Sequence, residues 1–342
     1  MAKDNAKYIL VTGAAGYIGS IVAEELIKDG KRIITLDNLI QGHRESVTDG
    51  AVFVKGDLGD PECLDGLFRS YNIDAVVHLA ARTLVGESVT NPELYFKNNL
   101  VYGLNLLNIM CKYRVRKIVF SSSCAVYGQP DKKSIDEDTP RNPISPYGEA
   151  KLAFERVLYW YARSYELSSI SLRYFNAAGA SDNFGEDHDP ETHLIPNVIK
   201  VALGQSGNIT VFGNDYPTED GSCIRDYIHV IDIAKAHILA LEKLDGPTMA
   251  KYLNLGNGKG YSVLEVIDVA RKITGADIPV VFGERRPGDP PVLVADSSMA
   301  RAKIGWEPEY GGLDIIIDSA YRWMKSHPSG YSGLRPESRV KL

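Results

Sequence analysis

The chain has 342 residues, of which 44% are hydrophobic and 24% are charged, and its formal net charge is −6. This length is enough for one large domain or two modest ones with a well-buried core. The acidic balance and the lack of a long Lys/Arg run argue against nucleic acid or an anionic membrane surface as a partner.

The amino-terminal segment lacks the apolar core of a signal peptide, and no apolar run approaches the ~20 residues that span a bilayer. The four cysteines are scattered, without a Cys-x-x-Cys motif. This pattern is typical of reduced thiols, so we expect a cytoplasmic protein that does not enter a membrane.

The first predicted unit is a strand, a glycine turn and a helix. Residues 7–12 form a short apolar run typical of a strand buried on both faces, and residues 13–19, Gly-Ala-Ala-Gly-Tyr-Ile-Gly, follow it directly. Bare backbone N–H groups at such a turn, together with the helix N-terminus, can bind a pyrophosphate. A second strand, 32–36, ends at Asp37, where an acid binds a ribose 2′-hydroxyl and repels a 2′-phosphate. The pattern therefore predicts NAD rather than NADP.

Strand and helix patterns continue to alternate after Asp37. Further strands are expected at 52–54, 75–81 and 117–120, with helices at 61–71 and 92–113. Apolar, non-alternating strands of this kind predict an α/β fold with a Rossmann-type, doubly wound parallel sheet. The ligand site of such a sheet lies at the carboxyl ends of its strands, where Asp37, Asp57 and Ser123 are expected.

Tyr147 and Lys151 stand four residues apart, just after Pro146, a residue suited to the first turn of a helix. Positions i and i+4 share one helix face, so a phenol and an ammonium group are predicted side by side. Ionising a free Tyr at pH 7 costs about 4 kcal/mol, and a neighbouring Lys⁺ can recover part of that cost. A Tyr-x-x-x-Lys match alone is common, and it gains meaning only beside the glycine turn.

Beyond Asn176 the periodicity loosens, and Gly, Asn, Asp and Pro become frequent. We expect residues 1–176 to form the cofactor domain, with later segments such as 226–245 returning to it. Residues 177–330 would form a smaller α/β domain for a second ligand, with short helices near 195–203, 232–244 and 263–274. The polar chain from Ser326 onward is expected to be peripheral, and residues 331–342 to be a tail.

Two loops of the second domain carry arginines, at Arg225 and Arg286. Arginines that face a cofactor domain suit an anionic ligand such as a diphosphate. The alternative is that they are surface residues paired with Asp220, Asp226 or Asp289.

Two histidine-bearing stretches are given structural interpretations. His78 lies in an apolar run, which favours a packed, hydrogen-bonded side chain over a catalytic one. Residues 185–193, Gly-Glu-Asp-His-Asp-Pro-Glu-Thr-His, fit neither His-Glu-x-x-His nor a calcium loop. We therefore expect no metal, and a solvated or substrate-covering loop at this position.

These motifs together resemble the extended short-chain dehydrogenase/reductase family and, within it, the sugar-nucleotide 4-epimerases, over residues 8–331. The segments that carry the resemblance are 11–20, 36–38, 85–88, 121–123, 126–128, Tyr147 with Lys151, 173–176 and 212–230. The first is shared by many sugar-nucleotide enzymes, whereas 212–230 is more selective for the epimerases.

The resemblance implies three sets of site residues and one interface. The catalytic set is Ser123, Tyr147 and Lys151. The implied contacts to a tightly held NAD are Gly13, Gly16, Tyr17, Ile18, Gly19, Asp37, Asn38, Asp57, Leu58, Leu79, Ala80, Ala81, Asn98, Tyr147, Lys151 and Phe175. The implied UDP-sugar pocket is Ser123, Tyr147, Asn176, Leu194, Thr210, Val211, Phe212, Arg225, Arg286 and Asp289. Helices near 92–113 and 147–165 are implied to form a homodimer through a four-helix bundle.

The implied reaction inverts C4 of a UDP-hexose through a transient 4-keto sugar, with Tyr147 as the base. Two positions depart from part of the family. Thr83 stands where some epimerases carry a Lys near the cofactor phosphates, which puts that contact in doubt. Leu293 is intermediate between a bulky Tyr and the smaller residues that admit N-acetylated sugars, so acetamido tolerance stays open.

Several competing interpretations remain. A dehydratase or decarboxylase of the same family would carry an acid after the site serine, whereas Cys124 and Ala125 follow Ser123. A 4-epimerase of another UDP-sugar (N-acetylhexosamine, uronic acid or pentose) and an NAD-dependent sugar-nucleotide dehydrogenase stay open. A non-catalytic dinucleotide sensor would need none of the catalytic set.

Overall fold

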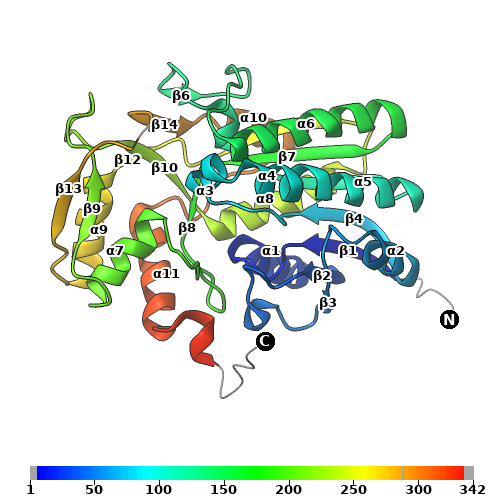
Figure 1. Ribbon diagram of the computed structural model, residues 1–342, viewed down its shortest axis with the longest axis horizontal. Helices are drawn as coiled ribbons and strands as arrows, with labels where there is room; N and C mark the ends of the chain where they lie inside the picture. Colours follow the sequence, from blue (N-terminus) through cyan, green and yellow to red (C-terminus); the bar gives the residue numbers. More distant parts are fainter. Residues whose placement is uncertain (1–5, 287–288, 335–342) are drawn as a thin grey trace.

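The structure is a computed structural model and describes residues 6–286 and 289–334. A seven-stranded sheet, parallel throughout, forms the centre of the larger part of the described chain (Figure 1). In order across the sheet its strands are β11 (Ala250–Leu255), β7 (Ser168–Tyr174), β5 (Lys117–Ser123), β4 (Asn72–His78), β1 (Lys7–Thr12), β2 (Ile33–Asp37) and β3 (Val52–Lys55). The predicted doubly wound parallel sheet is confirmed.

Helices cover both faces of this sheet, which explains why its strands are apolar on both sides. One face is covered by α2 (Pro61–Ser70), α5 (Tyr102–Lys112) and α6 (Pro146–Tyr165), which bury Leu64, Leu106 and Phe154. The other is covered by α1 (Tyr17–Lys28) and α8 (Val230–Lys243), which bury Ile21 and Ile233. Because the strands run parallel, the carboxyl ends of β1, β2, β4 and β5 lie at one edge of the sheet.

The helix expected over 92–113 is divided in three. It consists of α4 (Pro92–Phe96), a π-helical turn η2 (Lys97–Val101) and α5, and it is preceded by α3 (Val85–Thr90). π-Helical turns occur often at functional sites. Here the turn carries the buried Asn99, whose side chain accepts from Arg82 N (2.8 Å) and donates to Arg82 O (2.9 Å), so it fixes the loop after β4.

The smaller part of the molecule contains short strands that the sequence patterns did not reveal. Its main sheet runs β12 (Gly260–Ser262), β10 (Ile224–His229), β14 (Val292–Ala295) and β6 (Ser134–Ile135), with β8 (Asn176–Ala178) also paired to β10. A separate pair joins β9 (Ile209–Phe212) and β13 (Val280–Gly283). Strands of two or three residues, such as β6, β8 and β12, are too short to show a period of two.

The helices of this smaller part are α7 (Leu194–Ala202), α9 (Val263–Thr274), α10 (Ser298–Ile304) and α11 (Leu313–Ser326), and the 3-10 turns of the chain are η1 (Arg44–Ser46), η3 (Cys124–Tyr127) and η4 (Gly330–Leu334). The predicted helices near 195–203, 232–244 and 263–274 correspond to α7, α8 and α9. A capping box of Ser262 and Glu265 begins α9. The two parts exchange segments, since β6 joins the smaller sheet and β11 returns to the large one.

The carboxyl-terminal chain differs from the peripheral segment expected after Ser326. Tyr331 is buried, its hydroxyl donates to Gly185 O (3.2 Å), and its backbone N–H donates to Asp187 Oδ2 (2.9 Å). The chain therefore stays packed to this residue, while 335–342 lie outside the described residues.

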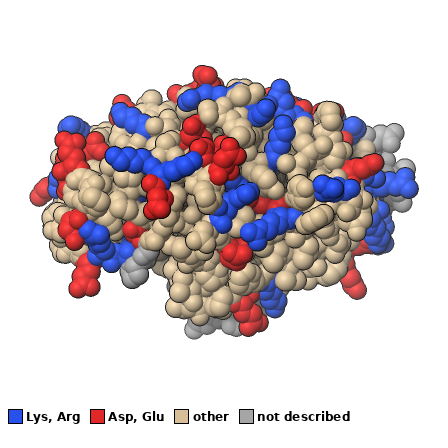
Figure 2. Space-filling view, turned by 90° about the horizontal axis from the view of Figure 1, so that it is seen from above, with Lys and Arg blue, Asp and Glu red and all other residues tan. Residues whose placement is uncertain are grey.

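The surface has mixed charge. On the face drawn in Figure 2, basic and acidic side chains are interspersed among uncharged ones, and neither sign covers the face. No helix within 6–286 and 289–334 is long and apolar enough to cross a membrane. All four cysteines are free thiols, as expected.

Candidate active site

The turn after β1 requires glycine for two independent reasons. Gly13 has a φ of +71°, and a Cβ there would lie 2.6 Å from the backbone N of Ala80. A Cβ on Gly19 would lie 2.0 Å from Gly13 O. The chain thus forms a cradle that side chains would fill, and Gly16, the N-cap of α1, offers no side chain to the first-turn N–H groups. Those donors suit a pyrophosphate, so the residues fit a dinucleotide.

The acids beside this turn are fixed by hydrogen bonds. Asp37, buried at the end of β2, accepts from Ala15 N (2.9 Å) and Leu39 N (2.8 Å). Burial raises the pKa of this carboxyl, and the two N–H donors hold the rise back. Asn38 Nδ2 donates to Asp57 Oδ2 (2.6 Å), so two further predicted residues meet at the same edge.

The remaining predicted cofactor residues differ in what they contact. Leu58 and Phe175 are buried, and the backbone of Ala80 packs directly against Gly13. The Tyr17 hydroxyl donates to Gly179 O (2.6 Å), which ties α1 to the smaller part of the molecule. Asn98 donates within its own helical turn, to Leu94 O (2.8 Å). Ile18 is the second residue of α1, and Leu79 and Ala81 lie in the loop after β4.

Tyr147 and Ser123 come together where β5 ends and α6 begins. Ser145 caps α6 by accepting from Gly148 N (3.2 Å), which sets the position of the first turn and of Tyr147 within it. Tyr147 is 9% exposed. Burial raises the pKa of Tyr147 to about 12, and the neighbouring Ser123 side chain acts in the opposite direction. The protein alone therefore holds the phenol protonated at neutral pH.

Lys151 lies one turn beyond Tyr147 and is also buried. Its Nζ donates to Ser121 O (2.7 Å) and lies 5.8 Å from the centre of the Tyr147 ring. Burial lowers the pKa of Lys151 to about 7. The predicted Tyr–Lys pair is thus placed on one face, in surroundings that leave both groups short of their charged forms.

A buried network that the sequence patterns did not predict lies beneath this pair. Glu155 and Arg173 form an ion pair (2.6 Å) whose side chains are 1% and 0% exposed. Ser122 Oγ donates to Glu155 Oε1 (2.6 Å), and Arg173 Nη1 donates to the Tyr127 hydroxyl (2.8 Å). Glu155 follows Lys151 at i+4, so the face already defined by Tyr147 and Lys151 was the signal that could have identified it.

His78 is a structural residue, as predicted. Its Nδ1 is hydrogen-bonded to the Thr12 hydroxyl (2.8 Å), and its ring stacks on Phe120. Burial lowers the pKa of His78 to about 3, so the imidazole is neutral. It packs the interface between β1 and β4 and carries no charge to the site.

The predicted second-ligand residues lie on separate strands, helices and loops, and two pairs of them are in contact. Arg225 on β10 pairs with Asp289 (3.2 Å) and donates to Pro290 O (2.9 Å). The Arg286 guanidinium stacks over the Phe212 ring at 4.2 Å. Thr210 and Val211 precede Phe212 on β9, Leu194 begins α7, and Asn176 Nδ2 donates to Asp226 O (2.9 Å).

The alternative pairing of the arginines is realised only in part. Asp226 is buried and accepts from the backbone N of Asn257 (2.8 Å) and Gly258 (3.0 Å). Asp220 accepts from the side chains of Ser222 and Ser262. Of the three acids considered, only Asp289 pairs with a site arginine, and within residues 6–286 and 289–334 no ion pair of Arg286 is found.

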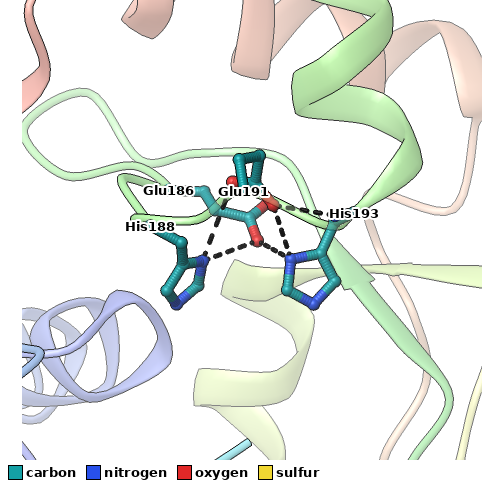
Figure 3. A group of neighbouring side chains, drawn as sticks. All are labelled: Glu186, His188, Glu191 and His193. Atoms are coloured by element: carbon teal, nitrogen blue, oxygen red, sulfur yellow. Dashed lines mark hydrogen bonds and ion pairs between the residues drawn. The ribbon is translucent and has the colours of Figure 1, made fainter. Parts of the chain in front are cut away.

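Residues 185–193 form a loop, as expected, and this loop is only partly solvated, because Asp189, Pro190, Thr192 and His193 are exposed whereas Gly185 and Glu186 are buried. Glu186, His188, Glu191 and His193, the Glu/His cluster, point toward one another, and both carboxylates are buried (Figure 3). Burial alone would lower the pKa of both histidines. Hydrogen bonds to Glu186 and Glu191 and their negative charges have the larger effect, and they raise the pKa of His188 to about 9 and that of His193 to about 10.

A doubly wound parallel sheet with a glycine cradle, and a buried Tyr and Lys on one helix face at its carboxyl edge, defines a dinucleotide-dependent enzyme of the short-chain dehydrogenase/reductase type. Residues 9–256 match the model of the NAD dependent epimerase/dehydratase family. The chain belongs to this family.

Individual relatives align over nearly the whole chain. A UDP-glucose 4-epimerase of Halalkalibacterium halodurans is 51% identical over 326 residues, 95% of this chain and 97% of that one. The crystal structure of UDP-glucose 4-epimerase from Brucella ovis in complex with NAD superposes with a TM-score of 0.90 at 44% identity, covering 93% and 98%. The UDP-Glc/GlcNAc 4-epimerase of Campylobacter jejuni superposes with a TM-score of 0.83 at 39% identity, covering 94% and 100%.

Proposed function

We propose that this chain is an NAD-containing UDP-glucose 4-epimerase, an isomerase that interconverts UDP-glucose and UDP-galactose. The observation that carries the proposal is the buried Tyr147 with Lys151 beside it on one face of α6, in the same sheet-and-helix frame as the Gly13 cradle. The full-length similarity to UDP-glucose 4-epimerases supports the choice of substrate.

The roles of the chain's own residues follow from their chemistry. When bound, NAD⁺ would accept hydride from C4 of the sugar and return it to the opposite face of the transient 4-keto sugar. Tyr147 Oη takes the proton of the 4-hydroxyl, and Ser123 orients that hydroxyl. Because burial holds the phenol protonated, Tyr147 becomes a base only when further positive charge lies beside it, as the oxidised cofactor provides.

The proposed substrate contacts bind the nucleotide firmly and the sugar more loosely. Arg225 and Arg286 would bind the diphosphate, and Phe212 would border the nucleotide. Leu293 packs with Phe175 in the cluster beneath the catalytic turn. Because relatives carry either a bulky Tyr or a smaller residue at this position, we propose that Leu293 limits the size of the sugar's 2-substituent.

An elimination reaction is disfavoured by the residue after Ser123. Cys124 is the neighbour, and burial raises the pKa of its thiol to about 12. A thiol so weakly acidic is a poor general acid for expelling a hydroxide.

The second candidate function is a 4-epimerase of another UDP-sugar, favoured by the 39% identity to an enzyme described as a UDP-Glc/GlcNAc 4-epimerase.

We also propose that the enzyme is a cytoplasmic homodimer, assembled through η2–α5 and α6. Exposed apolar side chains on these elements support the interface: Val101 is 48% exposed and Trp160 is 61% exposed. Trp160→Glu should convert a dimer into a monomer in sedimentation velocity. A monomeric parent protein would contradict the assembly and leave the reaction untouched.

The activity is tested by chromatography of UDP-sugars. Purified protein, without added nucleotide, is incubated separately with UDP-galactose and with UDP-N-acetylgalactosamine. Conversion of UDP-galactose to its 4-epimer is expected and would establish both the reaction and retained NAD. Conversion of the second substrate as well would show that Leu293 admits the acetamido group. No conversion of either, even with added NAD, would falsify the UDP-hexose assignment.

A further inference from the structure

The Glu/His cluster brings two carboxylates and two imidazoles to one point in the loop between β8 and α7 (Figure 3). His188 Nδ1 lies 3.1 Å from Glu186 Oε1 and 3.8 Å from Glu191 Oε2. His193 Nδ1 lies 2.7 Å from Glu186 Oε1 and 2.9 Å from Glu191 Oε1. One ligand atom from each residue lies within 4.8 Å of all the others.

Burial makes positive charge at this point necessary. The Glu186 and Glu191 side chains are 6% and 3% exposed, and two buried carboxylates so close together need compensation. Within the described residues, no Lys or Arg forms an ion pair with either carboxylate. The compensation comes either from two protonated imidazoles or from one dication held by two neutral imidazoles.

We propose that the Glu/His cluster is a structural binding site for one divalent transition-metal ion, with Zn²⁺ the ion that best fits its donors. Two nitrogen and two carboxylate donors form a closed tetrahedral set, whereas Ca²⁺ and Mg²⁺ prefer oxygen alone. Tetrahedral zinc separates neighbouring ligand atoms by about 3.3–3.5 Å. The four ion-pair distances bracket this value, so small side-chain movements complete the site.

Access and sequence spacing are consistent with this site. The side chain of His193 is 47% exposed, which gives an ion a route from solvent. Both Glu and both His come from one short stretch, 186–193, which explains why the spacing matches no helical zinc motif. The loop's own fold, rather than a regular element, brings the donors together.

The metal would brace the junction between the two parts of the molecule. The His188 ring packs edge-on against the Tyr17 ring, whose centre lies 6.3 Å away at the start of α1. His193 directly precedes Leu194, the first residue of α7. Asp187, within the same loop, accepts from Tyr331 N and contacts His43. Fixing the loop therefore fixes the cofactor side relative to the proposed substrate side.

The test uses untagged, full-length protein and does not depend on activity. After purification without chelators, elemental analysis should find about one zinc ion per chain. After chelation, calorimetric titration with ZnCl₂ should restore one site and raise the melting temperature. Co²⁺ should give the intense visible d–d bands of tetrahedral coordination.

Matched variants separate this site from adventitious surface binding. The double variant H188A/H193A should lose the calorimetric site, whereas His327→Ala, which removes a histidine outside the cluster, should keep it. Glu191→Gln retains the shape of the loop and should weaken zinc at least tenfold, which covers the case in which the double variant fails to fold. No zinc binding by the parent protein, or equal binding by parent and Glu191→Gln, would overturn the proposal.

Discussion

The two halves of the candidate site hold their charged groups in different ways. On the cofactor half, the ion pair of Glu155 and Arg173 is almost fully buried and linked to Ser122 and Tyr127. On the substrate half, Arg285 and Asp215 pair at 44% and 69% side-chain exposure. Under the proposed function, the catalytic groups therefore stand on a rigid, buried base, while the loops on the substrate side include at least one ion pair that water can reach; Arg225, at 11% side-chain exposure, is the buried exception.

This division suits an epimerase. A hydride must leave and return at one atom, so the catalytic groups need fixed positions, and regular elements provide them through β5 and α6. The sugar must turn over between the two transfers, so it gains from loose contacts while its diphosphate stays anchored. Four predictions break or sharpen the contrast.

The largest effect is expected at Tyr147. Replacing it with Phe removes the only group proposed to move the proton of the 4-hydroxyl and leaves the ring packing intact. We expect kcat to fall by about 10²–10⁴-fold, the usual contribution of positioned acid–base catalysis. Bound NAD and the affinity for UDP, measured by absorbance and calorimetry, should stay near the parent values. Retained turnover would show that another group carries the proton.

The next effect concerns the buried ion pair. Arg173→Met leaves Glu155 as an uncompensated buried charge, which should lower the free energy of unfolding by about 3–5 kcal/mol. The double variant R173M/E155L removes both charges and should recover much of this loss. Denaturant unfolding measures both values.

The matched control for this pair lies in the substrate half. Arg285→Met breaks an exposed pair, and such pairs are worth about 0.2–1 kcal/mol. Equal costs for Arg173→Met and Arg285→Met would contradict the contrast between the two halves.

A smaller effect is expected at the glycine cradle. Gly13→Ala places a Cβ against the Ala80 backbone at positive φ, a conformation that costs an L-residue about 1–2 kcal/mol before any clash. We expect a lower melting temperature and protein that is isolated with less bound NAD. Gly86→Ala, in the first turn of α3, meets no atom within 4 Å and serves as the control, with little change expected in melting temperature or NAD content. Full NAD content in Gly13→Ala would mean that the cradle does not hold the cofactor.

The same division explains how much the sequence could predict. The parallel sheet and the meeting of Asp37, Asn38 and Asp57 follow from local patterns, because each strand carries its own turn and each turn lies at the same edge. The pairing of Tyr147 and Lys151 follows from helix periodicity alone. These features depend on neighbours in sequence.

The features that escaped prediction depend on contacts between distant segments. Strands β9 and β13 pair with each other across about 70 positions of the sequence, so the pairing depends on a contact that no local pattern shows. The network around Arg173 joins α6, β7 and η3. The Glu/His cluster requires a loop to turn back on itself, and its spacing fits no helical or strand period. The burial of the two carboxylates in this cluster could be seen only once the folded loop was known.

The smallest effect is expected at Arg286. Its guanidinium stacks on Phe212, and no described acid forms an ion pair with it, so its donors remain for a diphosphate. Lys keeps the charge and loses the planar fork, so Arg286→Lys should raise KM for UDP-galactose by about tenfold, or ~1.4 kcal/mol. Because the diphosphate is held equally before and during the reaction, kcat should change little. Arg285→Lys, whose parent side chain is already paired with Asp215, should leave both constants near the parent values. A fall in kcat without a change in KM would indicate that Arg286 acts on the reacting sugar rather than on the nucleotide.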